Sequence, residues 1–307
     1  MVSEVAYNRE VTEAHASGDL HVHGLGERGG CWASWDSSAI VEKGVAGNTA
    51  EHLLQFAVKA RHEWHNFQRL SGFESLMGGI VGDSEKTSWL KTLITGLGED
   101  GGRVLLGLEE QSREDSGRVL EAIFAGLRSP AAQTGRLAPA VVFTDAYDWG
   151  SESDLSLYEP ANALCSPIFM HRREATTRRA VDPWLDGAAP GVNTGVLGAV
   201  TLNLPRAAFT SGDEGEFFEH VWNLTGLAVD GLEAKRAQLD AELKAGDMPA
   251  TGSVVDSFDD FFGAVGVVGV NEALINLVER EIGSMQGKVI AYKVLEAIQD
   301  RLEEKDK

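Results

Sequence analysis

The chain has 307 residues, of which 43% are hydrophobic and 24% are charged, so it can bury a large core and is not disordered. Forty-seven acidic residues against 27 basic ones give a formal net charge of -20, which repels phosphate backbones and argues against general nucleic-acid binding. No apolar run is long enough to span a membrane, and the polar, acidic start is no signal peptide. We therefore expect a cytoplasmic protein without membrane or nucleic-acid partners.

The acidic, lysine-poor composition suggests a halophilic source, because a salt-rich cytoplasm screens the repulsion between surface carboxylates. We expect the melting temperature to rise when the salt concentration is increased to the molar range. A fall in melting temperature in a thermal scan would contradict the hypothesis.

The first half of the chain shows alternating and helical patterns. Residues 19–23 and 31–36 read as short strands, and residues 50–70 have the apolar spacing of an amphipathic helix. Further helices are predicted over residues 85–97 and 104–127, followed by a buried strand over 138–145.

The second half begins with a loop over residues 183–195, where Pro183, Gly187, Pro190 and Gly191 break any regular element. A strand over 198–205 ends at its proline, and a long helix follows over about 213–245. Residues 263–281 read as a glycine-rich strand that turns into a helix, and a last helix covers about 284–304. Strands separated by helices predict an α/β fold, and the absence of an obvious linker favours a single domain over residues 1–307.

Three histidines near the N-terminus raise the question of a metal site. His21 and His23 are two residues apart on a predicted strand and so share a face, and His15 lies nearby. A metalloenzyme using these three residues is an alternative, but no acidic ligand stands at a suitable spacing, and we favour local packing and no metal. His62 and His65 have the wrong spacing for a zinc protease, and a P-loop is absent.

Five stretches, in order, resemble the class III (anaerobic) ribonucleoside-triphosphate reductases of the glycyl-radical enzyme family. They are AHASGDLHVHGL (14–25) with CWASWD (31–36), RHEWHNFQRLSGFESLMG (61–78), VVFTDAYDW (141–149), GVLGAVTLNLPRAAF (195–209) and VGVNEALINLVE (268–279). The resemblance covers nearly the whole chain, but only the central part of the family's longer sequence. It implies part of a ten-stranded α/β barrel built from half-barrels of parallel strands with surrounding helices.

The resemblance implies reduction of ribonucleotides to deoxyribonucleotides by thiyl-radical chemistry. In this family a glycyl radical generates a cysteine thiyl radical, which takes the 3'-hydrogen of the ribose. A second cysteine faces the sugar, and formate or a thiol system is the reductant. Such chemistry needs a sulfur held within near-attack distance in a sealed site.

Carried over by position, the resemblance assigns Cys31 as the sugar-facing thiol. His21, His23 and Asn203 become candidate substrate-binding residues. Asn271 and Glu272, in GVNEAL, match a turn that lines the nucleotide pocket, where a helix N-terminus would face phosphate oxygens.

The chain departs from the family at the radical cysteine, where 170-MHRR-173 has no cysteine and Cys165 lies a few residues upstream. Gly24 stands where the family usually has aspartate. The sequence also shows no ATP cone and no glycyl-radical segment, so the domain is expected to be an incomplete reductase barrel.

Two functions follow. The first is a reductase component whose partners are ribonucleoside triphosphates, a separate C-terminal glycyl-radical polypeptide and a radical-SAM activase, with a homodimer through the helix over 50–70. The second is a catalytically inactive nucleotide-binding or scaffold homologue.

Overall fold

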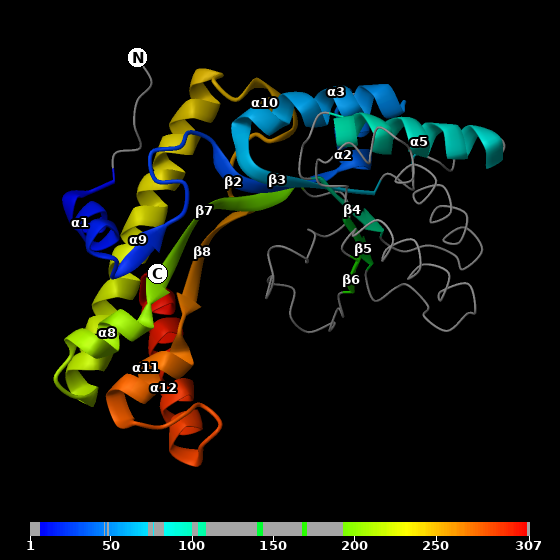
Figure 1. Ribbon diagram of the computed structural model, residues 1–307. Coiled ribbons are helices and arrows are strands. Elements are labelled where there is room, and N and C mark those ends of the chain that lie inside the picture. Colours follow the sequence, from blue (N-terminus) through cyan, green and yellow to red (C-terminus); the bar gives the residue numbers. More distant parts are fainter. Residues whose placement is uncertain are drawn as a thin grey trace, which may run out of the picture. The chain divides into compact units, whose positions relative to one another are not determined.

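The computed structural model describes residues 7–45, 47, 49–72, 76, 83–99, 104–108, 140–143, 168–170 and 193–305. Their contacts divide the chain into two compact units, each assembled from segments distant in the sequence (Figure 1). Unit 1 contains residues 1–31, 196–242 and 261–307, and unit 2 contains residues 32–195 and 243–260. The expectation of a single domain stays a prediction.

Unit 1 is built around three strands, β1 (Leu20–Val22), β7 (Thr194–Asn203) and β8 (Phe261–Val268). β1 pairs with β7 in the antiparallel sense, and β8 also pairs with β7. Five helices accompany these strands: α1 (Arg9–Ser17), α8 (Leu204–Thr210), α9 (Glu214–Ala245), α11 (Val270–Val278) and α12 (Met285–Lys305).

The core of unit 1 lies between the strands and the helices. Val200 and Leu202 of β7 are buried together with Leu20 and Val22 of β1, and α9 contributes the buried Val221. Because side chains alternate across a strand, this burial of the even-numbered residues leaves Thr201 and Asn203 on the other face of β7.

Unit 2 contains a sheet with the strand order β2-β3-β4-β5-β6. The strands are β2 (Gly30–Asp36), β3 (Trp64–Ser71), β4 (Val104–Leu108), β5 (Ala140–Phe143) and β6 (Ile168–Met170). β3 to β6 are parallel to one another. The helices of the described part of this unit are α2 (Ser37–Glu42), α3 (Ala50–Ala60), the short 3-10 helix η1 (Arg61–Glu63), α5 (Asp83–Glu99) and α10 (Pro249–Val254).

Aromatic side chains hold the core of unit 2. The ring of Trp35 packs edge-on against Phe56 and Trp64, with centroids 5.4 and 5.8 Å apart, and Trp64 packs in the same way against Phe258. The indole N–H groups of Trp35 and Trp64 are satisfied, since Trp35 donates to Gln68 at 2.7 Å and Trp64 donates to Thr251 at 2.9 Å.

The predicted α/β class is confirmed, but the described strands of unit 2 form an open sheet, and no closed barrel is present among them. The antiparallel pairing of β1 with β7 also departs from the all-parallel expectation. None of the described helices is long and apolar enough to cross a membrane.

Two predicted helices are wrong in part. The helix predicted over residues 50–70 ends at Ala60, and residues 64–71 form the strand β3. The helix predicted over 104–127 begins instead with the strand β4, and its remainder lies outside the described residues. The strands predicted over 19–23, 31–36, 138–145 and 198–205 and the helices over 85–97, 213–245 and 284–304 are confirmed to within a few residues.

Candidate functional site

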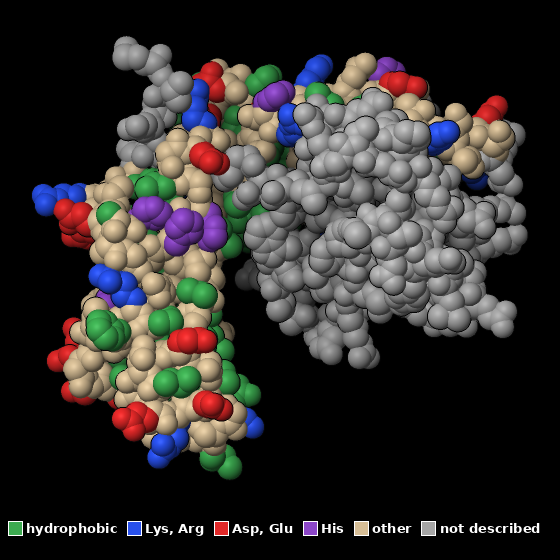
Figure 2. All heavy atoms as spheres, viewed as in Figure 1, with side chains coloured by type: hydrophobic (Ala, Val, Ile, Leu, Met, Phe, Trp, Pro, Cys, Tyr) green, Lys and Arg blue, Asp and Glu red, His purple; other side chains and the backbone are tan. Residues whose placement is uncertain are grey.

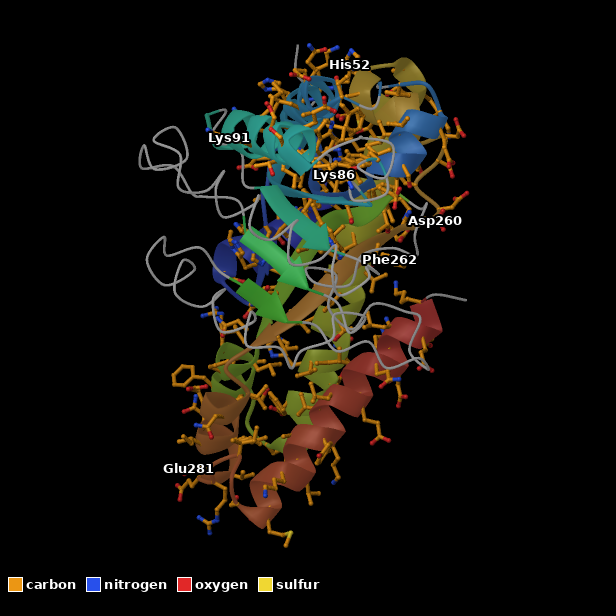
Figure 3. The ribbon with its side chains drawn as sticks, turned by 90° about the vertical axis from the view of Figure 1, so that its right-hand side faces the viewer. His52, Lys86, Lys91, Asp260, Phe262 and Glu281 are labelled. Carbon is orange, nitrogen blue, oxygen red and sulfur yellow. The ribbon has the colours of Figure 1, made fainter. Side chains whose placement is uncertain are left out.

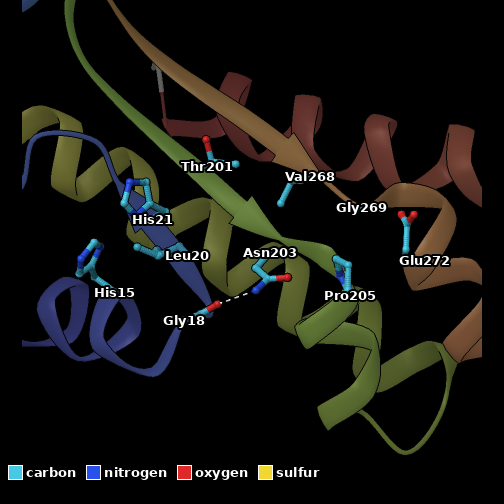
Figure 4. A pocket seen from close by; sticks show the side chains of 10 residues that line it. All are labelled: His15, Gly18, Leu20, His21, Thr201, Asn203, Pro205, Val268, Gly269 and Glu272. Atoms are coloured by element: carbon cyan, nitrogen blue, oxygen red, sulfur yellow. Dashed lines mark hydrogen bonds between the residues drawn. The ribbon is translucent and has the colours of Figure 1, made fainter. Parts of the chain in front are cut away.

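A pocket of about 750 Å³ opens within unit 1 where four segments meet (Figure 4). Its wall is formed by α1 and the turn after it, by β1, by the end of β7 with the start of α8, and by the end of β8 with the start of α11. The lining residues are His15, Gly18, Leu20, His21, Thr201, Asn203, Pro205, Val268, Gly269 and Glu272. The polar lining therefore consists of two imidazoles, a hydroxyl, an amide and a carboxylate, without lysine or arginine.

The register of β1 against β7 explains why His21 reaches the pocket. His21 pairs directly with Thr201, while the neighbouring pairs Leu20–Leu202 and Val22–Val200 are buried in the core. Side chains that are directly opposite in a strand pair lie on the same face of the sheet. His21 and Thr201 therefore point together away from the core.

Gly269 allows the end of β8 to close one wall. Its φ angle is +73°, in the left-handed region, and a Cβ atom there would lie 2.2 Å from Cγ of Pro205. Any other residue would be strained and would push the start of α8 away. Glycine at this position thus brings Glu272, in the first turn of α11, to the pocket.

Asn203 connects the end of β7 to two other segments. Its Nδ2 donates to the carbonyl oxygen of Gly18 at 2.9 Å, and its Oδ1 accepts from the backbone N–H of Arg206 at 3.3 Å. The second bond makes Asn203 the N-cap of α8. The backbone N–H of Asn203 also donates to the carbonyl oxygen of Asp19 at 3.0 Å, so the turn after α1 is held against β7.

An ion pair adds to this connection. Arg206 lies 2.7 Å from the carboxylate of Asp19 and donates a hydrogen bond to it. Burial alone would raise the pKa of the Asp19 carboxyl, but hydrogen bonds from Ser17 and Arg206 and the positive charge of Arg206 bring the pKa below its usual value. Asp19 is therefore ionised at neutral pH, and it holds Arg206 outside the pocket lining.

Three histidines form a row beside the pocket, and Figure 2 shows histidine side chains gathered on the surface of this part. The rings of His15 and His21 lie 5.1 Å apart, and those of His21 and His23 lie 4.7 Å apart. Nδ1 of His15 accepts the backbone N–H of Val22 at 3.0 Å, so the neutral ring carries its proton on Nε2. The row therefore has a fixed hydrogen-bond donor at His15.

His23 is held by β7 and is not a pocket residue. Its Nε2 lies 2.8 Å from the hydroxyl oxygen of Thr201. Burial, followed by the nearby charge of His21, lowers the pKa of His23, which favours the neutral ring. Within the described part of the chain, no group of three or more His, Cys, Asp or Glu residues is arranged to hold a metal ion.

A family model described as anaerobic ribonucleoside-triphosphate reductase matches residues 148–307, just over half of the chain. The chain belongs to this family. The matched residues contain two of the five stretches that resemble the class III reductases, 195–209 and 268–279.

Solved reductase structures share the fold. The anaerobic ribonucleotide reductase from Thermotoga maritima with citrate in the active site superposes with a TM-score of 0.74 at 16% identity, covering 96% of this chain and 66% of that chain. The same enzyme in complex with dATP and CTP gives a TM-score of 0.68 at 16% identity, covering 96% and 61%. Another anaerobic ribonucleotide reductase gives 0.72 at 17% identity, covering 96% and 57%.

The present chain thus spans between 57% and 66% of the chain length in these three reductase structures. A search of curated proteins gave no match.

The structure brings together three of the residues that the reductase resemblance selected. His21, Asn203 and Glu272 line one pocket although they lie far apart in the sequence. Asn271 does not line it, because its Oδ1 accepts the backbone N–H of Ile282 at 2.9 Å and holds the loop before α12. The roles assigned to all these residues stay predictions.

Of the two cysteines assigned to the reductase chemistry, Cys31 lies among the described residues and Cys165 does not. Cys31 is 1% exposed, at the start of β2, and is not among the residues that line the pocket. It acts electrostatically on the partly buried Tyr7 and the buried Lys235. Burial and, to a smaller extent, Cys31 raise the pKa of Tyr7 to about 12. Burial lowers the pKa of Lys235, against the opposing effects of Glu242, Cys31 and Glu27. Cys165 lies outside the described residues, as do His171 and Arg172.

Sequence reasoning missed His15 and Thr201 as pocket residues. Strand alternation predicts that Thr201 lies on the same face as Asn203, because the two residues are two positions apart on β7. His15 belongs to α1, which was not predicted, although Asn8 at its N-cap and Gly18 after its last residue are the usual helix boundaries.

Proposed function

We propose that this chain is the nucleotide-binding part of an anaerobic ribonucleoside-triphosphate reductase and that its unit 1 pocket receives a ribonucleoside triphosphate. One observation carries the proposal. His21, Asn203 and Glu272, selected by their positions in family motifs, converge on one pocket of about 750 Å³. Family membership and the shared fold support it.

The pocket chemistry favours the sugar over the phosphates. Glu272 places a negative charge beside the start of α11, and no lysine or arginine lines the pocket to offset the charge of a phosphate group. A carboxylate accepts hydrogen bonds from hydroxyl groups, and the N–H of His15 donates them. We therefore assign the ribose to this pocket and the triphosphate to the space outside it. The start of α11 then faces the ribose, and not the phosphate oxygens that the resemblance implied.

The reduction step is proposed by resemblance. Cys31 is proposed as the thiol that faces the sugar and Cys165 as the cysteine that carries the radical, within a barrel that a further polypeptide completes. A glycyl radical from that polypeptide would supply the radical, a radical-SAM activase would generate it, and formate or a thiol system would be the reductant. A cytoplasmic location and a halophilic source belong to the same proposal.

Calorimetry with ATP, CTP and deoxynucleoside triphosphates tests the binding step. We expect at least one ribonucleotide to bind, and Glu272→Gln to weaken its affinity by about tenfold, as for the loss of a charged hydrogen-bond acceptor. A matched Glu279→Gln variant changes an exposed carboxylate that does not line the pocket and should bind normally.

If none of these nucleotides binds, the proposed function is contradicted. An anaerobic assay with the activase, formate and a radical-bearing partner then separates the two candidate functions. Formation of deoxynucleotide supports the reductase component, whereas nucleotide binding without turnover supports the inactive scaffold.

A further inference from the structure

Lys235 is a buried lysine of unit 1 that lies outside the pocket lining. It belongs to α9 and is 2% exposed, although lysine is almost never fully buried without a partner. Its Nζ donates a hydrogen bond to the carbonyl oxygen of Glu27 at 2.7 Å. Gly198 of β7 makes room for the lysine stem, since a Cβ atom at this glycine would lie 3.3 Å from Cγ of Lys235. The ammonium group is therefore held at a fixed place in the interior.

The segment that leads to Cys31 is held against α9 at two points. The first is the hydrogen bond from Lys235 to the carbonyl oxygen of Glu27. The second is an ion pair, in which Nε of Arg28 lies 3.2 Å from the buried carboxylate of Glu242. Cys31 follows a few residues later, belongs to the same unit and is 1% exposed. α9 thus fixes both the ammonium group and the backbone that carries the thiol.

The buried lysine and the buried cysteine act on each other electrostatically. Burial lowers the pKa of Lys235, and Cys31 opposes this effect because a negative thiolate favours the ammonium form. A coupling between two groups is reciprocal, so the ammonium of Lys235 favours the thiolate of Cys31 to the same extent. A cation beside a cysteine is the usual means by which a protein stabilises a thiolate.

Four other titratable side chains act at this place. The carboxylates of Glu242 and Glu27 also favour the ammonium form of Lys235. The carboxylate of Glu242 is paired with Arg28, and the side chain of Glu27 is exposed, so water screens its charge. The pKa of Tyr7, raised to about 12 by burial and by Cys31, keeps the phenol neutral near pH 7. The ammonium of Lys235 is thus the buried positive charge that acts on the cysteine sulfur.

We propose that Lys235 is a positioning residue for Cys31 and that its ammonium holds the cysteine as a thiolate. The Sγ–H bond of Cys31 breaks and its proton passes to the neutral amine of Lys235, so a thiol and an amine become a thiolate and an ammonium. The thiolate is the nucleophilic form of cysteine, and the proton stays on the lysine beside it. The use of this thiolate on a sugar rests on the proposed function, in which Cys31 faces the ribose.

The first test follows the cysteine. The full chain with Cys165→Ala keeps Cys31 as its only thiol, and the S–H stretching band in the Raman spectrum reports the protonation of a buried sulfur. We expect Lys235→Met, which keeps the length of the side chain and removes its charge, to raise the midpoint of thiolate formation by at least about one pH unit. Lys91→Met is the matched control, because Lys91 is an exposed lysine of α5 in unit 2, labelled in Figure 3. Its midpoint should equal that of the parent chain.

A reciprocal test follows the lysine and does not require Lys235→Met to fold. Side-chain NMR of the chain labelled at lysine gives the midpoint at which Lys235 loses its proton, and the signal is assigned by its absence from Lys235→Arg. Cys31→Ser, which is nearly isosteric, removes the thiolate and should lower the midpoint of Lys235. The decrease should match the increase seen for Cys31 in Lys235→Met, because the coupling is shared. Circular dichroism confirms that each variant keeps the fold of the parent chain.

An unchanged Lys235 midpoint in Cys31→Ser would overturn the proposal. So would a Cys31 midpoint that stays in place in folded Lys235→Met, or that moves as far in Lys91→Met, since the latter would show a general effect of net charge. Calorimetry with nucleotides on the parent chain separates this result from the proposed function. Nucleotide binding with unmoved midpoints leaves the proposed function standing without the pair, whereas moved midpoints without nucleotide binding leave the pair standing without that function.

Discussion

Replacing Glu63 with alanine is expected to lower the free energy of unfolding of unit 2 by about 3 kcal/mol, because two charged hydrogen bonds of roughly 1.5 kcal/mol each are lost. Glu63 is 9% exposed, and its carboxylate accepts the backbone N–H groups of Ala250 and Thr251, each at 2.8 Å. Met248, at the N-cap of α10, provides no side-chain bond of its own. Glu63 therefore caps α10 from a distant part of the sequence, where a negative charge also suits the helix dipole.

Hydrogen exchange measured by mass spectrometry checks this prediction locally. Exchange over residues 249–254 should accelerate by roughly a hundredfold in Glu63→Ala if the helix opens with the lost free energy. Glu63→Gln keeps one acceptor oxygen and should have an intermediate effect. Glu51→Ala removes an exposed carboxylate from the first turn of α3 and should leave exchange in α10 unchanged. Unaltered exchange in Glu63→Ala would show that the cap does not hold α10.

The same region shows why sequence patterns succeeded only in part. Residues 50–70 have helical spacing throughout, yet the helix ends at Ala60. The following segment pairs with β4 from Gln68 to Leu70, and Trp64 bonds to Thr251, a partner that lies 187 residues away in the chain. Local periodicity contains no information about such partners, so tertiary pairing overrode the helical pattern.

Other predicted elements were also right where local sequence decides the structure and wrong where distant partners decide it. The segment 263–281 was predicted as a strand turning into a helix, and β8 and α11 confirm it, because the turn is made locally at Gly269. β4 differs from the prediction of a helix that starts at residue 104. A short run of leucines is compatible with both a helix and a buried parallel strand, so its pattern alone does not distinguish them.

The candidate site depended on resemblance more than on pattern. Alternation places His21 on one face of a strand, but only the pairing with Thr201 and the closure at Gly269 bring it into a pocket with Glu272. Asn203 and Asn271 looked equivalent in the motifs. Their hydrogen bonds distinguish them, since Asn203 joins segments that form the pocket and Asn271 holds the loop before α12.

This difference leads to the second prediction, for Asn203→Ala. The variant removes the donor to the carbonyl of Gly18 and the cap of α8, which together should cost unit 1 about 2 kcal/mol of unfolding free energy. Because both bonds hold walls of the pocket, we also expect nucleotide affinity to fall by at least about tenfold. Denaturant unfolding and calorimetry measure the two effects separately.

Two further variants identify the cause of any loss. Thr49→Ala removes the N-cap bond of α3 in unit 2 and should cost about 1 kcal/mol without changing nucleotide affinity. Asn203→Asp keeps an acceptor for the N–H of Arg206 but cannot donate to Gly18, so it isolates the bond between β7 and the turn after α1. If affinity falls in Asn203→Asp as far as in Asn203→Ala, this bond determines the shape of the pocket. If both variants bind nucleotide as the parent chain does, Asn203 stabilises the fold alone and the pocket does not depend on it.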